Sequence, residues 1–518
     1  METGHLTAIY IGVAIYFAAM LSVGYIVKNK IKVTEDYLVG GRKFTLLFNA
    51  PALTACFLGG SLILSLPGAT YGMGVWSDSA MFGSAISLGG IFCLLIAGFF
   101  YMPKLWRLKL LSLGDYFYNR FGKPTGITVS IVTVMTFVFW VAVQILVFAK
   151  ICTVFLGWDL FWSALLGIAI ICVYTSMGGL WAVMVTDMIQ VALVTIGVVV
   201  LLPLALPLVG GWDAFVAAVP SERTHVFPQV ADAHVWLAWL ATWCVVGIGS
   251  VVSPDLMQRA FAAKTAAVAR NSAIVAAIIK TVLSIIMILL ALVGLVMTNT
   301  GIIPESMLQG DMELIVPVMV KEFLPLPLMI LFIGASLSAV MGAASSALLA
   351  MSGMMSKNII KDFVKPDISD KQLLFLSRIC VILFSCMALY AALNLKYVFL
   401  LVAFGFDLIM ASLFACMTLG MYWKKTNGYG AVAGIIAGLL VRIIPAGIAN
   451  GFTLEGVCSS APGWYIYTLL GPIVAFAVTI IVSLSTQKLN PSNEYGFHYD
   501  ANDNPISIDQ AKAKAGAI

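Results

Sequence analysis

Residues 324–361 read LPLPLMILFIGASLSAVMGAASSALLAMSGMMSKNIIK. At about 1.5 Å rise per residue, a helix over 329–356 would be roughly 40 Å long, enough to cross a hydrocarbon core of about 30 Å with tilt. One face of this helix would carry only small and hydroxyl-bearing residues, which are Ser338, Ala339, Gly342, Ser345 and Ser346. Such a face suits close packing against another helix, or coordination of a hard cation by hydroxyls and carbonyls.

The composition around this stretch is that of an all-α polytopic membrane protein. The 518 residues are 61% hydrophobic and only 10% charged, and the mean hydropathy is +1.02. The first apolar run lacks the basic start of a cleaved signal peptide, so we expect it to be retained. We expect about thirteen spans, at residues 6–28, 44–72, 76–102, 125–155, 159–177, 183–208, 236–261, 272–298, 326–357, 373–394, 397–423, 428–448 and 464–485.

Lysine and arginine gather in the connections on one side of these spans. The positive-inside rule then places the N-terminus outside and the C-terminus in the cytoplasm of a plasma membrane, the inner membrane if the cell is bacterial. The formal charge of +5 is therefore a topology signal and predicts no nucleic-acid partner. Neither a disulfide framework, a metal-ligand spacing nor a nucleophile and base pair is evident, so we expect no enzyme and no obligate protein partner.

Two predicted spans contain helix-breaking residues where the bilayer is deepest. The span 44–72 carries Gly59-Gly60-Ser61, and the span 236–261 carries Gly249-Ser250 followed by Ser253-Pro254-Asp255. A simple kink is the alternative, but freed backbone groups at this depth are tolerated only beside protein or water. The two spans lie five spans apart, which predicts an inverted repeat of five plus five helices with a site between the breaks.

This repeat gives the expected domain organisation. The expected units are a peripheral first helix and cytoplasmic loop at 1–43, a first repeat at 44–208, a second repeat at 236–425, two peripheral helices at 426–485 and a cytosolic tail at 486–518.

A few polar residues lie inside predicted spans. Trp140 and Gln144 share a helix face and offer a π surface and an amide to a small solute, or they simply pack. Asp187 is costly in a membrane unless it is paired, solvated or serving an ion. Lys280 either snorkels to the interface or lines the core as a fixed cation. Asp407 is either a vestibule residue or a substrate gate.

Several motifs resemble those of the sodium:solute symporter family. They are YLVGGRKF, LSLPGATYGMG, YTSMGGLWAVMVTDMIQ, SPDLMQRAFAAKTAAVAR and SAVMGAASSALLAMSGMMSKNI, and the resemblance covers roughly residues 6–450 in order. NGYGAVAG is similar to the high-affinity choline transporter branch, whereas the context of Pro254 is closer to bacterial proline-type members. The resemblance implies a LeuT-type core with alternating access.

The resemblance also implies ion sites. The principal sodium site would use carbonyls of Ala55, Leu58 and Ala339, but its two hydroxyl positions read Gly342 and Ala343. This principal site is therefore expected to be degenerate.

A second sodium site, known in some members, maps onto Asp187, Ser345 and Ser346, which are all present. Coupling then runs through this second site, through protonation of Asp187, or is absent. Beyond a coupling Na⁺ or H⁺, we expect no cofactor.

The solute site is predicted from the same resemblance and from the broken spans. Two walls of the aromatic cage of choline-type members read Phe57 and Trp140, while a third reads Ser253, which argues for a smaller or more polar solute. Asp255 either pairs with an amine or forms an ion pair with Arg259 one turn away. The predicted substrate-binding residues are Phe57, Ser61, Trp140, Gln144, Ser253 and Asp255.

The function that follows is a secondary active transporter that imports a small polar organic solute, with the solute and the lipid bilayer as its partners. The alternatives are a sodium-independent facilitator and a solute sensor on a transporter scaffold.

Overall fold

The computed structural model describes residues 3–27, 31–76, 85–395, 398–452 and 463–498. These residues are overwhelmingly helical, and their only bridge of β type joins Phe44 to Ala263. Within these described ranges, twelve helices are long and apolar enough to cross a membrane, and a shorter apolar helix covers Leu160–Val173. The multi-pass all-α class is therefore confirmed, while the exact number of thirteen spans stays a prediction.

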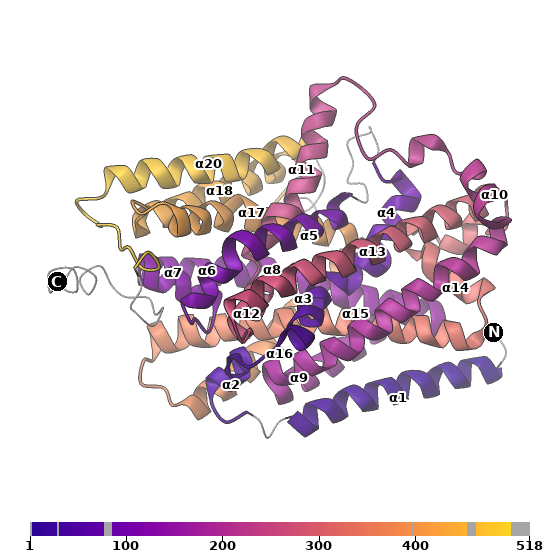
Figure 1. The fold of residues 1–518 in the computed structure, drawn as a ribbon, viewed down its shortest axis with the longest axis horizontal. Helices are drawn as coiled ribbons and strands as arrows, with labels where there is room; N and C mark the ends of the chain where they lie inside the picture. Colours follow the sequence, from indigo (N-terminus) through magenta and orange to yellow (C-terminus); the bar gives the residue numbers. More distant parts are fainter. Residues whose placement is uncertain (1–2, 28–30, 77–84, 396–397, 453–462, 499–518) are drawn as a thin grey trace.

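Figure 1 shows the helices that position the site, labelled in chain order. They are α1 (Thr3–Val27), α2 (Thr34–Val39), α3 (Leu46–Gly60), α4 (Leu66–Met73), α5 (Ala85–Ile96), α6 (Met102–Arg107), α7 (Leu113–Phe121), α8 (Lys123–Leu156), α9 (Leu160–Ala205), α10 (Gly211–Ala218), α11 (Ala233–Gly249), α12 (Pro254–Ala262), α13 (Ala266–Asn299), α14 (Ile315–Phe323), α15 (Leu326–Gly353), α16 (Asp370–Asn394), α17 (Val398–Tyr422), α18 (Gly428–Asn450) and α20 (Trp464–Ser485).

Helix α9 holds two of the expected spans, 159–177 and 183–208, in one element. Its helical conformation is interrupted at Gly179, where φ is 49° and ψ is −150°. A side chain there would be strained, and its Cβ would lie 2.9 Å from the Tyr37 carbonyl oxygen. Glycine therefore allows the chain to turn where α2 packs against it.

Both predicted helix breaks are present. Near the end of α3, Gly59 has ψ near −149°, and a π-helical turn at Ser61–Ser65 then leads into α4. Helix α11 gives way to a 3₁₀ turn at Ser250–Val252 and an extended Ser253. Helix α12 then starts at Pro254, whose missing N–H costs nothing in a first helical turn.

Helix α15 lies in the middle of the bundle and packs against α3, α8 and α9. Helices α18 and α20 pack on each other and on α17 at one edge, whereas α1 runs along α9 at the opposite edge (Figure 1). The small-residue face of α15 therefore serves close packing, with its residues Gly342 to Ser346 all buried.

Asp407 joins the peripheral helices to the core. Its Oδ2 forms an ion pair with the Nε of Arg442 on α18 and accepts a hydrogen bond of 2.8 Å from the Thr468 hydroxyl on α20. The side chain is buried among these partners, so in this conformation Asp407 acts as a structural tie between α17, α18 and α20.

Candidate functional site

The break in α3 is closed by a side chain from α8. The Gln144 Oε1 accepts a hydrogen bond of 2.7 Å from the Gly60 amide, and its Nε2 donates to the Trp140 carbonyl at 3.3 Å. A Cβ on Gly59 would meet the Gln144 oxygen and would lie 2.8 Å from the Ala343 Cβ. Gly59 therefore lets three helices meet, and in this conformation the Gln144 amide caps the freed backbone.

Two of the residues assigned to the principal sodium site, Ala55 on α3 and Gly342 on α15, lie close to each other. A Cβ on Gly342 would lie 3.6 Å from the Cβ of Ala55. The same point lies 2.6 Å from the Gln190 Oε1 and 3.0 Å from the Asp187 Oδ1. Neither oxygen has a hydrogen-bond partner in the described part of the protein. Two acceptor atoms from α9 thus face the place where a hydroxyl is missing.

Gln190 is a candidate that sequence reasoning missed. It follows Asp187 by three residues on α9, and residues at this spacing share a helix face. Its side chain is buried, with only 1% exposed. The motif TDMIQ contained this signal, but the pairing of Gln190 with a glycine on another helix was not visible in it.

The second predicted ion site holds a guanidinium group. The Arg259 Nη2 lies 3.2 Å from the Asp187 Oδ2, and neither side chain has any exposed surface. The same nitrogen donates to the Ser346 hydroxyl, while the Ser345 hydroxyl donates to the Gly342 carbonyl at 3.0 Å. Asp187 and Ser346 are thus brought together, with the positive charge of Arg259 between them.

The considered ion pair between Asp255 and Arg259 does not form. Arg259 contacts only the backbone carbonyl of Asp255, at 3.4 Å, because its charge turns to Asp187. The Asp255 Oδ1 instead accepts from the amide of Leu256 at 2.8 Å. This carboxylate caps the first turn of α12, where the helix dipole favours a negative charge.

Lys280 does not snorkel. It lies in the middle of α13, at least roughly 20 Å from either end at 1.5 Å per residue, and it is 1% exposed. Its Nζ donates to the Phe57 carbonyl at 3.2 Å and lies 5.9 Å from the centre of the Phe57 ring. The lysine therefore reaches the backbone of α3 shortly before its break.

The two aromatic walls of the predicted solute site contact different helices. Phe57 faces Lys280 on α13, whereas the Trp140 ring lies 5.1 Å from that of Phe406 on α17. The Trp140 Nε1 has no partner among the described residues. The two remaining predicted residues, Ser61 and Ser253, are both buried in the turns that interrupt the helices.

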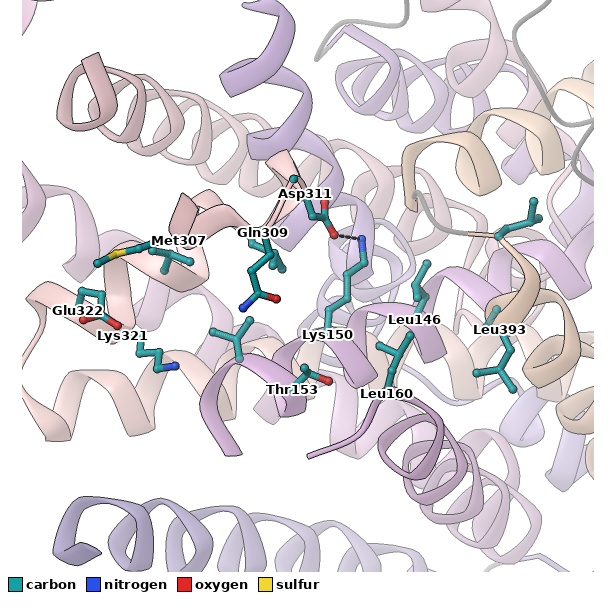
Figure 2. A pocket seen from close by; sticks show the side chains of 16 residues that line it. Leu146, Lys150, Thr153, Leu160, Met307, Gln309, Asp311, Lys321, Glu322 and Leu393 are labelled. Carbon is teal, nitrogen blue, oxygen red and sulfur yellow. Dashed lines mark ion pairs between the residues drawn. The ribbon is translucent and has the colours of Figure 1, made fainter. Parts of the chain in front are cut away.

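Sequence reasoning also missed a cavity of about 710 Å³ at the end of α8 (Figure 2). It lies beside the connection between α13 and α15. The Lys150 Nζ lies 2.6 Å from the Asp311 Oδ2 and 2.5 Å from the Glu313 Oε2, and Glu313 also accepts from the Val398 amide at 3.3 Å. Figure 2 shows the Gln309 side chain pointing into the cavity. The wall also carries Lys321 and Glu322.

The connection that carries Asp311 and Glu313 covers α4. A Cβ on Gly68 would lie 2.7 Å from the Cα of Glu313, and one on Gly72 would meet the sulfur of Met312. The absence of side chains at Gly68 and Gly72 therefore allows residues 305–323, the 305–323 segment hereafter, to pack closely over α4, the second half of the broken helix.

The sequence is similar to those of known membrane transporters. Human "High affinity choline transporter 1" is 27% identical over 416 residues, which are 79% of this chain and 70% of that protein. "Osmoregulated proline transporter OpuE" of Bacillus subtilis (strain 168) is 24% identical over 490 residues, 90% of this chain and 94% of that protein.

Among solved structures, the substrate-bound outward-open state of a Na⁺-coupled sialic acid symporter matches with a TM-score of 0.78 at 20% identity, covering 92% of this chain and 98% of that one. This likeness establishes the LeuT-type fold. The model of the sodium:solute symporter family matches residues 37–438. Because that match spans most of the sequence, the chain belongs to the sodium:solute symporter family.

Proposed function

We propose that this membrane protein is a secondary active transporter that imports a small polar organic solute by alternating access. The observation that carries the proposal is the pair of interrupted helices, α3–α4 and α11–α12, whose breaks lie in the buried core. Broken helices at this depth supply backbone groups to a bound solute or ion. The relatives are transporters, and the chain is no enzyme.

We place the coupling ion, Na⁺ or H⁺, at Asp187. The principal site lacks hydroxyls at Gly342 and Ala343, but the free oxygens of Asp187 and Gln190 face Gly342 and give a hard cation or a proton an acceptor pair. A sodium ion bound between Asp187 and Ser346 would first require Arg259 to withdraw. We therefore favour the Oδ1 side of Asp187 over the Oδ2 side.

One observation favours a second candidate function, a sodium-independent facilitator. Arg259 supplies a permanent positive charge to Asp187 and Ser346. A tethered cation neutralises the acid without an ion gradient, and transport would then only equilibrate the solute. The two candidates differ in whether the solute accumulates.

The solute class and the topology are part of the proposal. The names of the relatives point to choline and proline, which are both small, polar and organic. The positive-inside rule directs the cavity beside Lys150 to the outside of a plasma membrane, with the C-terminus in the cytoplasm.

The test is a thermal-shift screen of purified protein against small amines, amino acids and carboxylates, in sodium or in potassium salt. A ligand of the folded state raises the apparent stability by mass action. Solutes that stabilise are then offered to proteoliposomes with and without a sodium or proton gradient. Uptake that exceeds equilibration supports coupled transport, equilibration alone supports the facilitator, and no saturable uptake refutes both.

A further inference from the structure

Lys280 stands out among the buried cations of the described chain because it has so few partners. Arg120 also lacks an ion pair, but its guanidinium donates to four backbone carbonyls, those of Gly420, Trp423, Lys424 and Asn493. Three others have carboxylate partners: Arg259 with Asp187, Arg442 with Asp407, and Lys150 with Asp311 and Glu313. Lys280 forms no ion pair within the described residues, and its one hydrogen bond goes to the Phe57 carbonyl. The protein thus holds one ammonium group in its core without a countercharge of its own.

A single carbonyl dipole is a poor substitute for water around an ammonium group. Ionisable residues inside a membrane bundle are expensive, and they normally pair with one another or serve a ligand. Lys280 does not relieve the cost by reaching toward solvent, because its side chain is buried, with 1% exposed, and its Nζ is bound to the Phe57 carbonyl inside the bundle. A bound molecule with an acidic group would supply the countercharge that the described residues do not give to Lys280.

The surroundings are shaped to hold this ammonium group at the broken helix. A Cβ on Gly90 of α5 would lie 2.8 Å from the Cε of Lys280 and 2.9 Å from the Cδ1 of Phe57. Glycine at this position makes room for both side chains at once. Phe57 itself lies two residues before Gly59, where α3 loses its helical conformation. The charge consequently borders the backbone that the proposed solute site would use.

We propose that Lys280 is the anchor for a carboxylate, or another acidic group, of the transported solute. This inference rests on the proposed transport function and narrows the solute to an acid or a zwitterion. The acidic group pairs with the Lys280 ammonium, while the Phe57 ring covers an apolar or cationic part of the same molecule. A solute with a cationic group and no acid is disfavoured, because Lys280 repels it.

The experiment uses pairs of solutes that differ only by the acidic group. Choline is compared with glycine betaine, pyrrolidine with proline, and propanol with propionate, by thermal shift of the purified full chain. In at least one pair we expect the acid-bearing member to bind at least tenfold more tightly than its partner. In Lys280→Met and Lys280→Gln we expect this preference to fall at least tenfold, while Lys264→Met, which removes an exposed lysine, leaves it unchanged.

The melting temperature of the unliganded variants separates an anchor from a structural lysine. Removal of an unpaired buried charge should leave the melting temperature of Lys280→Met unchanged or raise it. A structural role would lower it. If Lys280→Met does not fold, the role of Lys280 is still tested by the acid preference of Lys280→Gln and by the comparison of the three solute pairs in wild type.

Two results would overturn the inference. One refutes only the role of Lys280, and the other also refutes the proposed transport function. If members without an acid bind and are transported as well as their partners, or if both lysine variants keep the preference, the anchor is wrong and the transport function stands. If no solute of the panel binds or crosses the membrane, the proposed function fails and the inference falls with it.

Discussion

The contact between Lys150 and Glu313 predicts how firmly the 305–323 segment is held over α4. Glu313 has no exposed side-chain surface, and Lys150 has 8%. Removing one partner of a buried pair costs about 3–5 kcal/mol. In Glu313→Gln the lysine keeps Asp311, whose side chain is 23% exposed, so we take the lower end, about 3 kcal/mol. At 1.36 kcal/mol per factor of ten, local opening becomes roughly 100-fold more frequent.

Hydrogen exchange of the backbone amides in the 305–323 segment measures this opening directly. We expect their exchange in Glu313→Gln to be roughly 100-fold faster than in wild type, with little change in α15. Glu305→Gln is the matched control, because Glu305 lies on the same segment and is exposed. Exchange rates within about threefold of wild type would refute the reasoning that this ion pair holds the segment closed.

Three further predictions concern the ion sites and the contact between Asp115 and Lys357. Asp187→Asn leaves Arg259 buried without its partner, so we expect the free energy of unfolding to fall by about 3–5 kcal/mol, and the added substitution Arg259→Met should recover part of this loss. The Asp187→Asn variant should still exchange solute across the membrane, and concentrative uptake by this variant would exclude Asp187 as the coupling acid. The double substitution Gly342→Ser and Ala343→Ser restores the missing hydroxyls, and Gln190→Ala is added because a Cβ on residue 342 would lie 2.6 Å from the Gln190 Oε1. We expect the triple variant to melt at a higher temperature in sodium than in potassium; equal melting temperatures would contradict the idea that the missing hydroxyls weaken sodium binding. Burial of Asp115 opposes its ionisation, but Lys357, Asn358 and the Leu111 amide outweigh burial and lower the pKa of Asp115. The stability advantage of wild type over Asp115→Asn should therefore be full above about pH 5 and shrink as the pH falls below about 4. An advantage that does not change with pH would show that the carboxylate is not the stabilising form.

The membrane class, the helix breaks and the family were all predictable from the sequence. Each depends on short motifs or on composition summed along the chain, and not on contacts between distant residues. Gly59-Gly60-Ser61 and Ser253-Pro254 interrupt helices by their own backbone properties, and apolar length reports directly on membrane spans. The thirteen expected spans were harder to count, since Gly179 bends α9 without separating it into two elements.

The partners of the buried charges were not predictable from the sequence. Spacing suggested Asp255 for Arg259, because residues four apart on a helix are neighbours, yet the structure pairs Arg259 with Asp187 from α9. For Lys280 the sequence left open snorkelling or a place in the core, and only the structure shows that it contacts a residue 223 positions away in the chain. Such contacts depend on how whole helices pack, which no local pattern contains.

The central claim is that the two broken helices enclose a solute that crosses the membrane. Counterflow of a labelled solute into proteoliposomes, using whichever solute stabilises the purified protein, tests it most directly. We predict saturable uptake that is half-maximal near the dissociation constant obtained from the rise of the melting temperature with solute concentration. A solute that binds and stabilises the protein but never enters the vesicles would contradict it, and would instead indicate a sensor built on a transporter fold.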